Sequence, residues 1–311
     1  MRWSWLVLAV VPVVLALPAQ QEQPPKYNVR VNIVSLDVEV LDRAGNPVLD
    51  LAQQDFVVRE QGKAMALTNF ARLQDRPVSL AIVLDTSAIS LKKLNSAKQF
   101  VFQLIHLLGR NDDICLYSFD ARDANLEQDF TKDRLLLVNA LENISVPSHR
   151  TGGVLAELFG AEPRTALGID LALLNLRKTN NGKKALLVIS NRFRGLGPAT
   201  VEHVQNSGFT LLTLGFSNKA ALLVTLGGDQ INRKQLMRES GGRQFSAYTA
   251  HITGVCRAIA YSLKNYYALS YLTQIGPNDE EPRRIKVLIP GHDYVINARR
   301  SYIPKEKRES E

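Results

Sequence analysis

The sequence has little cysteine: two residues, Cys115 and Cys256, in a chain of 311. Both lie inside apolar stretches, at 114–116 and 255–258, which is typical of cysteines that pack as small buried hydrophobic side chains. Two residues are too few for a fold that depends on a network of disulfide bonds. The hydrophobic content of 45% instead indicates an ordinary globular protein with a packed core.

The sequence also lacks the short motifs that mark common catalytic sites. It has no G-x-S-x-G elbow, no G-x-x-x-x-G-K-[ST] loop and no H-E-x-x-H. Gly195 and Gly197 form a partial G-x-G that lacks the third glycine of a dinucleotide-binding turn, so we interpret it as a loop. The five histidines show no metal-ligand spacing. We therefore expect a protein that is not an enzyme, with a hydrolase as the less favoured alternative.

Positive charge is in excess but is not concentrated. The chain has 38 Lys and Arg against 30 Asp and Glu, a net charge of +8, and the basic residues are spread along it. Because neither a basic stripe nor a nucleic-acid-binding motif is present, we expect no nucleic-acid partner. A basic surface still favours acidic partners.

The longest uncharged apolar stretch stands at the N-terminus. Arg2 precedes an apolar run at 6–17, Ala16 and Ala19 close it, and a glutamine-rich segment follows. This is the layout of a secretory signal peptide, and the run is shorter than the roughly 20 residues of a membrane span. We assign residues 1–19 to a signal peptide and expect an exported protein, periplasmic or secreted. No stable transmembrane anchor is expected after cleavage; a retained anchor is the alternative.

Two blocks of strand-like sequence flank the centre of the chain. Residues 26–75 alternate apolar and polar positions, most clearly at 28–40, where a slip of one residue predicts a β-bulge. Residues 264–303 return to the same pattern. We predict that the two blocks pair into one small β-sandwich and that residues 304–311 are a disordered tail.

The central block, residues 76–263, predicts an α/β domain. Nearly continuous apolar runs at 78–84 and 184–190 are typical of strands buried on both faces, and amphipathic helical stretches follow strands, as at 91–108. Such alternation predicts a doubly wound, mainly parallel sheet. Ligands of these sheets bind beyond the carboxyl ends of the strands, so the residues just after each strand are the site candidates.

These residues resemble the metal-site loops of von Willebrand factor type A domains. Asp85 and Ser87 follow the first buried strand in the spacing D-x-S, and Thr165 stands at the start of a predicted helix. In the family, such oxygens and an Asp after a later strand, here Asn191, hold Mg²⁺ or a similar cation whose open position takes a carboxylate of the partner. The resemblance implies a von Willebrand A-like fold and a non-catalytic, adhesion-type module.

Further segments resemble von Willebrand A-related proteins that are abundant in Acidobacteria. With them the resemblance extends roughly from Val29 to Pro304. That family is an exported group whose biochemical roles are mostly undefined. The segments lie at 31–34, 42–48, 55–62, 266–271 and 283–287.

Two positions depart from the family's metal-site pattern. Ile89 takes the third place of D-x-S-x-S and offers no oxygen, and Asn191 replaces the second Asp. Because Mg²⁺ takes about six hard oxygens, usually with carboxylate charge, we expect a degenerate site and no bound cofactor. Asp85 then pairs with an arginine or caps the following helix. The alternative is a working site that binds Mg²⁺ or another divalent cation weakly.

The same loops define the surface on which we expect a protein partner. Ser90 offers a hydroxyl next to Ile89, and Arg192 and Arg194 place positive charge beside Asn191, which favours an acidic partner. The predicted partner-binding face consists of Asp85, Ser87, Ser90, Thr165, Arg192 and Arg194.

Overall fold

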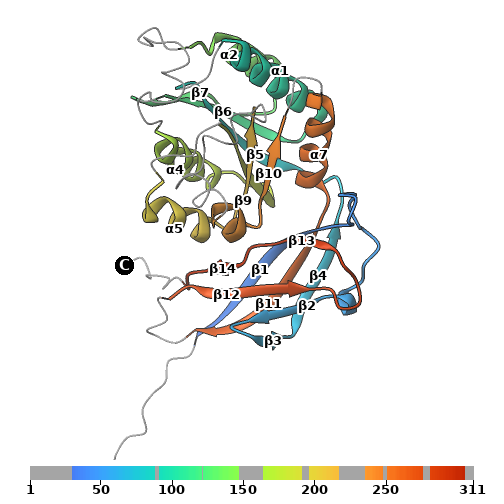
Figure 1. Cartoon of the computed structure of the whole chain (residues 1–311). Coiled ribbons are helices and arrows are strands. Elements are labelled where there is room, and N and C mark those ends of the chain that lie inside the picture. The colour runs from blue at the N-terminus through green and yellow to red at the C-terminus, as the bar shows by residue number, and fades with distance from the viewer. Residues whose placement is uncertain are drawn as a thin grey trace, which may run out of the picture.

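The computed structural model describes residues 30–87, 91–120, 122–146, 164–190, 196–216, 235–247, 251–275 and 281–304. These residues form one six-stranded sheet with helices and two four-stranded sheets (Figure 1). The predicted signal peptide and all but the first residue of the predicted tail lie outside the described residues.

The six-stranded sheet has the order β10-β9-β8-β5-β6-β7. The pairs from β10 to β6 are parallel, and β7 joins β6 antiparallel at one edge. Every residue of β5 is buried, as the nearly continuous apolar run predicts. The strands are β5 (Val78–Asp85), β6 (Asp113–Phe119), β7 (Ala124–Thr131), β8 (Lys183–Ile189), β9 (Thr210–Gly215) and β10 (Arg243–Ser246).

Helices cover both faces of this sheet (Figure 1). One face packs on α1 (Leu91–Leu107), α2 (Arg134–Asn143) and α7 (Ile252–Lys264). The other packs on α4 (Thr165–Leu176), α5 (Pro198–Ser207) and helical residues 235–240. The doubly wound, mainly parallel sheet is thereby confirmed. Among the described residues, no helix is long and apolar enough to cross a membrane.

Both flanking blocks contribute strands to two antiparallel sheets, of orders β13-β1-β11-β4 and β14-β12-β2-β3. Apolar side chains from both sheets share one core. This confirms the predicted small β-sandwich, while the residue boundaries between the blocks stay predictions. The strands are β1 (Arg30–Leu41), β2 (Val57–Glu60), β3 (Lys63–Met65), β4 (Leu67–Leu73), β11 (Tyr266–Ile275), β12 (Arg283–Leu288), β13 (Val295–Asn297) and β14 (Ser301–Tyr302), with a short 3-10 turn at Gln53–Asp55.

The predicted β-bulge in the first strand is wrong. The register of β1 with β11 runs without a shift from Arg30 to Val38. Val31 and Ile33 are 59% and 69% exposed, whereas Val34 is buried. The strand therefore keeps one phase, and its first apolar positions belong to the exposed face rather than to an inserted residue.

Both cysteines are buried free thiols, as predicted. Burial raises the pKa of the Cys256 thiol to about 12, and the Cys256 Sγ lies 3.5 Å from the Phe100 carbonyl oxygen. Cys115 sits in β6 against the helices of the other face. They serve the core as small hydrophobic side chains.

Ion pairs join the sandwich to the α/β domain at the amino ends of two strands of the six-stranded sheet, β8 and β10. Lys183, the first residue of β8, places its Nζ 2.8 Å from the Asp37 carboxylate and 4.3 Å from the centre of the Tyr266 ring. Arg243, the first residue of β10, lies 2.8 Å from the Glu39 carboxylate. The carboxyl ends of these parallel strands therefore point away from the sandwich.

Candidate functional site

The candidate site lies at the carboxyl ends of β5 and β8. These strands are parallel neighbours in which Leu84 pairs with Ile189, so the next residues, Asp85 and Ser190, lie side by side. We call Asp85, Ser87, Thr165 and Ser190 the Asp85 cluster. The sandwich contacts the amino ends of β8 and β10 and therefore does not cover this opposite edge.

The Asp85 carboxylate is buried and held by hydroxyl groups. Its Oδ1 accepts hydrogen bonds from the Ser87 backbone N–H at 2.9 Å and the Ser87 hydroxyl at 2.5 Å. Its Oδ2 accepts one from the Ser190 hydroxyl at 2.5 Å. Hydrogen bonds of this kind compensate for burying a charge, and they fix the position of Ser87 relative to the end of β5.

Ser190 is a site residue that the sequence analysis does not predict. It is buried, and its N–H donates to the Leu214 carbonyl at 3.0 Å, which ties it to β9. In the sequence it ends the apolar run at 184–190, next to the predicted Asn191. Its contact with Asp85 depends on the register between two parallel strands about 100 residues apart, which no local pattern reveals.

Backbone hydrogen bonds align the loops after β5 and β6. The Thr86 N–H and hydroxyl both donate to the Phe119 carbonyl, at 2.8 and 3.1 Å. The Arg164 N–H donates to the Asp120 carbonyl at 2.8 Å. The start of α4 is thereby held at the end of β6, beside the end of β5.

Thr165 begins α4 and has an incomplete polar environment. Its side chain is fully buried, and its Oγ1 has no hydrogen-bond partner among the described residues. One turn later, a Cβ on Gly168 would meet Val83 Cγ1 at 3.0 Å and Phe119 Cδ1 at 3.2 Å. Glycine therefore allows α4 to lie close to β5 and β6, which brings the Thr165 hydroxyl to the strand ends.

The oxygen atoms of the Asp85 cluster are of the kind that hard cations bind, but they carry too little negative charge for a typical Mg²⁺ site. The Asp85 cluster supplies one carboxylate and three hydroxyls, and the described residues contain no group of three or more His, Cys, Asp or Glu that could hold a metal. Mg²⁺ takes about six oxygens, with carboxylates or waters among them. Among the described residues of the site, the buried Thr165 hydroxyl lacks a hydrogen-bond partner and could bind a water or an ion.

The structure thus brings together some of the predicted residues. Asp85, Ser87 and Thr165 occupy the strand-end edge, as the sequence predicts. Ile89, Ser90, Asn191, Arg192 and Arg194 lie outside the described residues. Their membership in the partner-binding face, and the pairing of Asp85 with an arginine or a helix end, stay predictions.

Comparison with known proteins finds matches among solved structures. No protein-family model and no curated protein matches the chain. It is similar to an aerotolerance-related membrane protein from Bacteroides fragilis, at 18% identity over 60% of this chain and 98% of that one, with a TM-score of 0.45. It is also similar to von Willebrand factor type A from Catenulispora acidiphila, at 10% identity over 78% of this chain and 75% of that one, with a TM-score of 0.43. A third similar structure is the vWF domain of the type V pili tip protein Mfa5 from Porphyromonas gingivalis, at 13% identity over 60% of this chain and 94% of that one, with a TM-score of 0.42. All three TM-scores are low, so the fold class rests on the strand order and helix layers of the chain itself.

Proposed function

We propose that this chain is an exported, non-catalytic protein-binding module that takes its partner on the strand-end face of a von Willebrand A-like domain. The observation that carries the proposal is the Asp85 cluster, in which Ser87 and Ser190 hold a buried carboxylate at the edge where doubly wound sheets bind ligands. The spacing D-x-S and the position of Thr165, both of which resemble the family's metal-site loops, support the same assignment.

The internal bonding of the cluster supports a role in holding the strand ends. The Ser87 and Ser190 hydroxyls both donate to the buried Asp85 carboxylate and fix its position. Residues whose positions are fixed before a partner binds lose little conformational entropy on binding. The cluster therefore serves as a rigid centre for a contact surface.

The charge around the cluster selects the partner. Arg192 and Arg194 lie outside the described residues, but they follow β8 closely in the sequence, so we expect them to add two positive charges to this edge. The whole chain carries a net charge of +8. An acidic protein surface is the matching partner, because complementary charge steers encounter and suppresses wrong partners.

A crosslinking pulldown from the native host tests this function. The variant Asp85→Ala, Arg192→Ala, Arg194→Ala is expected to lose the partners that the wild-type chain captures. The control Asp50→Ala, Arg110→Ala, Lys178→Ala makes the same change in charge at exposed residues away from the strand ends and should keep them. Unchanged partners in the first variant would overturn the proposal.

A metal-dependent adhesion site is the second candidate, favoured by the buried Thr165 hydroxyl that has no partner among the described residues. Asp85, Ser87 and Thr165 would hold the cation, which would offer its open position to a carboxylate of the partner. We instead infer a degenerate site, because the described donors carry one negative charge. Calorimetric titration with Mg²⁺ at millimolar concentration should give no saturating heat; such heat, if lost in Asp85→Ala, would establish the metal-dependent site.

A further inference from the structure

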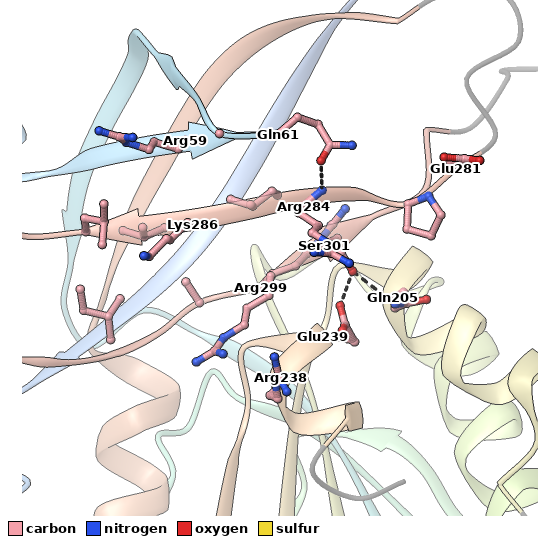
Figure 2. A pocket seen from close by; sticks show the side chains of 18 of the residues that line it. Arg59, Gln61, Gln205, Arg238, Glu239, Glu281, Arg284, Lys286, Arg299 and Ser301 are labelled. Atoms are coloured by element: carbon pink, nitrogen blue, oxygen red, sulfur yellow. Dashed lines mark hydrogen bonds between the residues drawn. The ribbon is translucent and has the colours of Figure 1, made fainter. Parts of the chain in front are cut away.

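A cleft of about 1130 Å³ runs along β12, at the junction of the sandwich and the α/β domain (Figure 2). On one side it is lined by β12 and by the chain segment that leads from β13 to β14. On the other side lie Gln205 of α5 and the helical residues Arg238 and Glu239. We call it the β12 cleft. It faces the sandwich, whereas the Asp85 cluster lies at the opposite edge of the central sheet.

Cationic side chains dominate the lining of the β12 cleft. It carries six basic residues and two acidic ones, Glu239 and Glu281. Glu239 accepts a hydrogen bond from the Ser301 hydroxyl, which also accepts one from Gln205 at 3.2 Å (Figure 2). The basic residues are Arg59, Arg238, Arg284, Lys286, Arg299 and Arg300.

Three of these cations crowd one face of a sheet. Lys286 pairs directly with Arg59 across β12 and β2, and Arg284 lies two residues along the strand, on the same face. All three side chains are exposed, and none forms an ion pair with another described residue. Like charges placed opposite one another destabilise a sheet. An anionic group bound over Arg59, Arg284 and Lys286 would offset this repulsion between their positive charges.

The backbone edge of β12 is open next to these charges. β14 pairs with Arg283 and Arg284 alone, and the Ile285 N–H still reaches the Arg300 carbonyl at 2.7 Å. Because backbone groups alternate sides along a strand, the N–H and C=O of Val287 point the same way as those of Ile285, toward the cleft. No described strand pairs with Val287 on that side. An extended chain can add there by main-chain hydrogen bonds.

We propose that the β12 cleft binds an extended acidic segment of another protein, which adds as a short strand beside Val287. Its Asp or Glu side chains lie against Arg284 and Lys286 on the outer face of the sheet. Its alternate residues are apolar, because they face Ile296 and Tyr294, which also line the cleft. This site is independent of the strand-end face, so either assignment can fail alone.

Fluorescence polarisation with a labelled peptide that alternates glutamate and valine tests the proposal on the full chain. Binding is expected, and Arg284→Glu, Lys286→Glu should weaken it by about tenfold or more, equivalent to about 1.4 kcal/mol. The control Lys92→Glu, Arg110→Glu makes the same charge change at exposed residues outside the cleft and should leave affinity unchanged. A thermal melt confirms that each variant is folded.

A second peptide separates strand addition from simple charge attraction. N-methylation of alternate backbone amides keeps the charge and blocks the ladder, so it should abolish most of the binding. Equal binding of the methylated peptide would overturn strand addition. Absence of binding by the unmodified peptide would overturn the site. The cations would then serve to keep the sheet edges of different molecules apart. If a polysaccharide polyanion such as heparin binds more tightly than the unmodified peptide, the proposal that the ligand is a protein segment would be overturned.

Discussion

At the scale of the residue, Thr165 has the least complete surroundings in the candidate site. Its hydroxyl is buried without a described partner, which costs about 1–3 kcal/mol relative to a satisfied one. Thr165→Val keeps the shape of the side chain and removes the hydroxyl. In the presence of a chelator, we expect it to raise the free energy of unfolding by about 1 kcal/mol, measured by urea denaturation.

Thr165→Ser is the control, because it keeps the hydroxyl and removes the methyl group. It should lower stability by about 1 kcal/mol through lost apolar burial. If Thr165→Val instead destabilises the protein, the hydroxyl holds a water or an ion. Repeating the comparison with Mg²⁺ then distinguishes the two.

The candidate site shows how far single residues can be predicted from the sequence. Asp85 and Ser87 are found because they follow a recognisable buried strand within a short motif. Thr165 is predicted because its place at the start of a predicted helix resembles the threonine of the family's metal-site pattern. Ser190 is not found, because its hydrogen bond to Asp85 arises from the register of β5 with β8, a property of the folded sheet.

At the scale of the element, α4 is held against the sheet by its glycine. Gly168→Ala gains up to about 1 kcal/mol of helix propensity. It also places a Cβ at 3.0 Å from Val83 Cγ1, and overpacking of this kind costs about 1–3 kcal/mol. We expect a net loss of stability of about 1 kcal/mol in urea denaturation, because β5 and the packed Phe119 ring leave no room to give way.

Gly254→Ala is the matched control in α7. A Cβ at Gly254 meets nothing within 4 Å, so the substitution should stabilise the protein by about 0.5–1 kcal/mol. If both variants stabilise the protein, the contact of α4 with β5 is looser than the 3.0 Å approach at Gly168 indicates.

Glu60 of β2 connects four strands of the sandwich. Its carboxylate accepts hydrogen bonds from Thr273 and Tyr271 of β11, Arg283 of β12 and Tyr302 of β14. Burial raises the pKa of Glu60, but these four hydrogen bonds outweigh it and hold the pKa below its usual value of 4.5. The charged form is therefore favoured in the folded state.

A carboxylate whose pKa is lower in the folded state than in the unfolded state stabilises the fold at pH values above its unfolded-state pKa. This stabilisation is lost as the pH falls through the folded-state pKa. Glu60→Gln should lower the free energy of unfolding by about 1.5–3 kcal/mol at pH 7. The difference from the wild type should shrink as the pH falls below 4.5. Urea denaturation at several pH values measures it; a difference that stays constant with pH would contradict the role of the charge.

Within the six-stranded sheet, the strands with the clearest sequence pattern are those buried on both faces. β5 and β8 are continuous apolar runs because the central sheet is covered by helices. β7 and β10 are not predicted: β7 is a polar edge strand with one neighbour, and β10 has four residues. The β-bulge in β1 is wrong because apolar residues also occupy the exposed face of an antiparallel strand.

At the scale of the whole molecule, the junction keeps the two proposed binding surfaces at opposite ends of the α/β domain. The sandwich holds the amino ends of β8 and β10 through Lys183 and Arg243, so the Asp85 cluster, at the carboxyl ends, lies on the side away from it. The β12 cleft, in contrast, includes residues of both parts. Loosening the junction should therefore disturb the cleft and leave the Asp85 cluster intact.

The two partners of the Lys183–Asp37 ion pair differ in burial, so substituting one or the other should change the stability of the junction by different amounts. The Lys183 side chain is 4% exposed and that of Asp37 is 34% exposed. Asp37→Asn leaves a buried ammonium with the Tyr266 ring and a weaker amide acceptor, whereas Lys183→Met leaves a carboxylate that water reaches. We expect Asp37→Asn to lower the free energy of unfolding by about 2–3 kcal/mol and Lys183→Met by about 1 kcal/mol or less, both measured by urea denaturation.

The double variant should be no less stable than Asp37→Asn, because the methionine replaces the buried charge by an apolar side chain. Equal losses in the two single variants would mean that the ammonium finds another partner or solvent, and that this contact does not hold the sandwich in place.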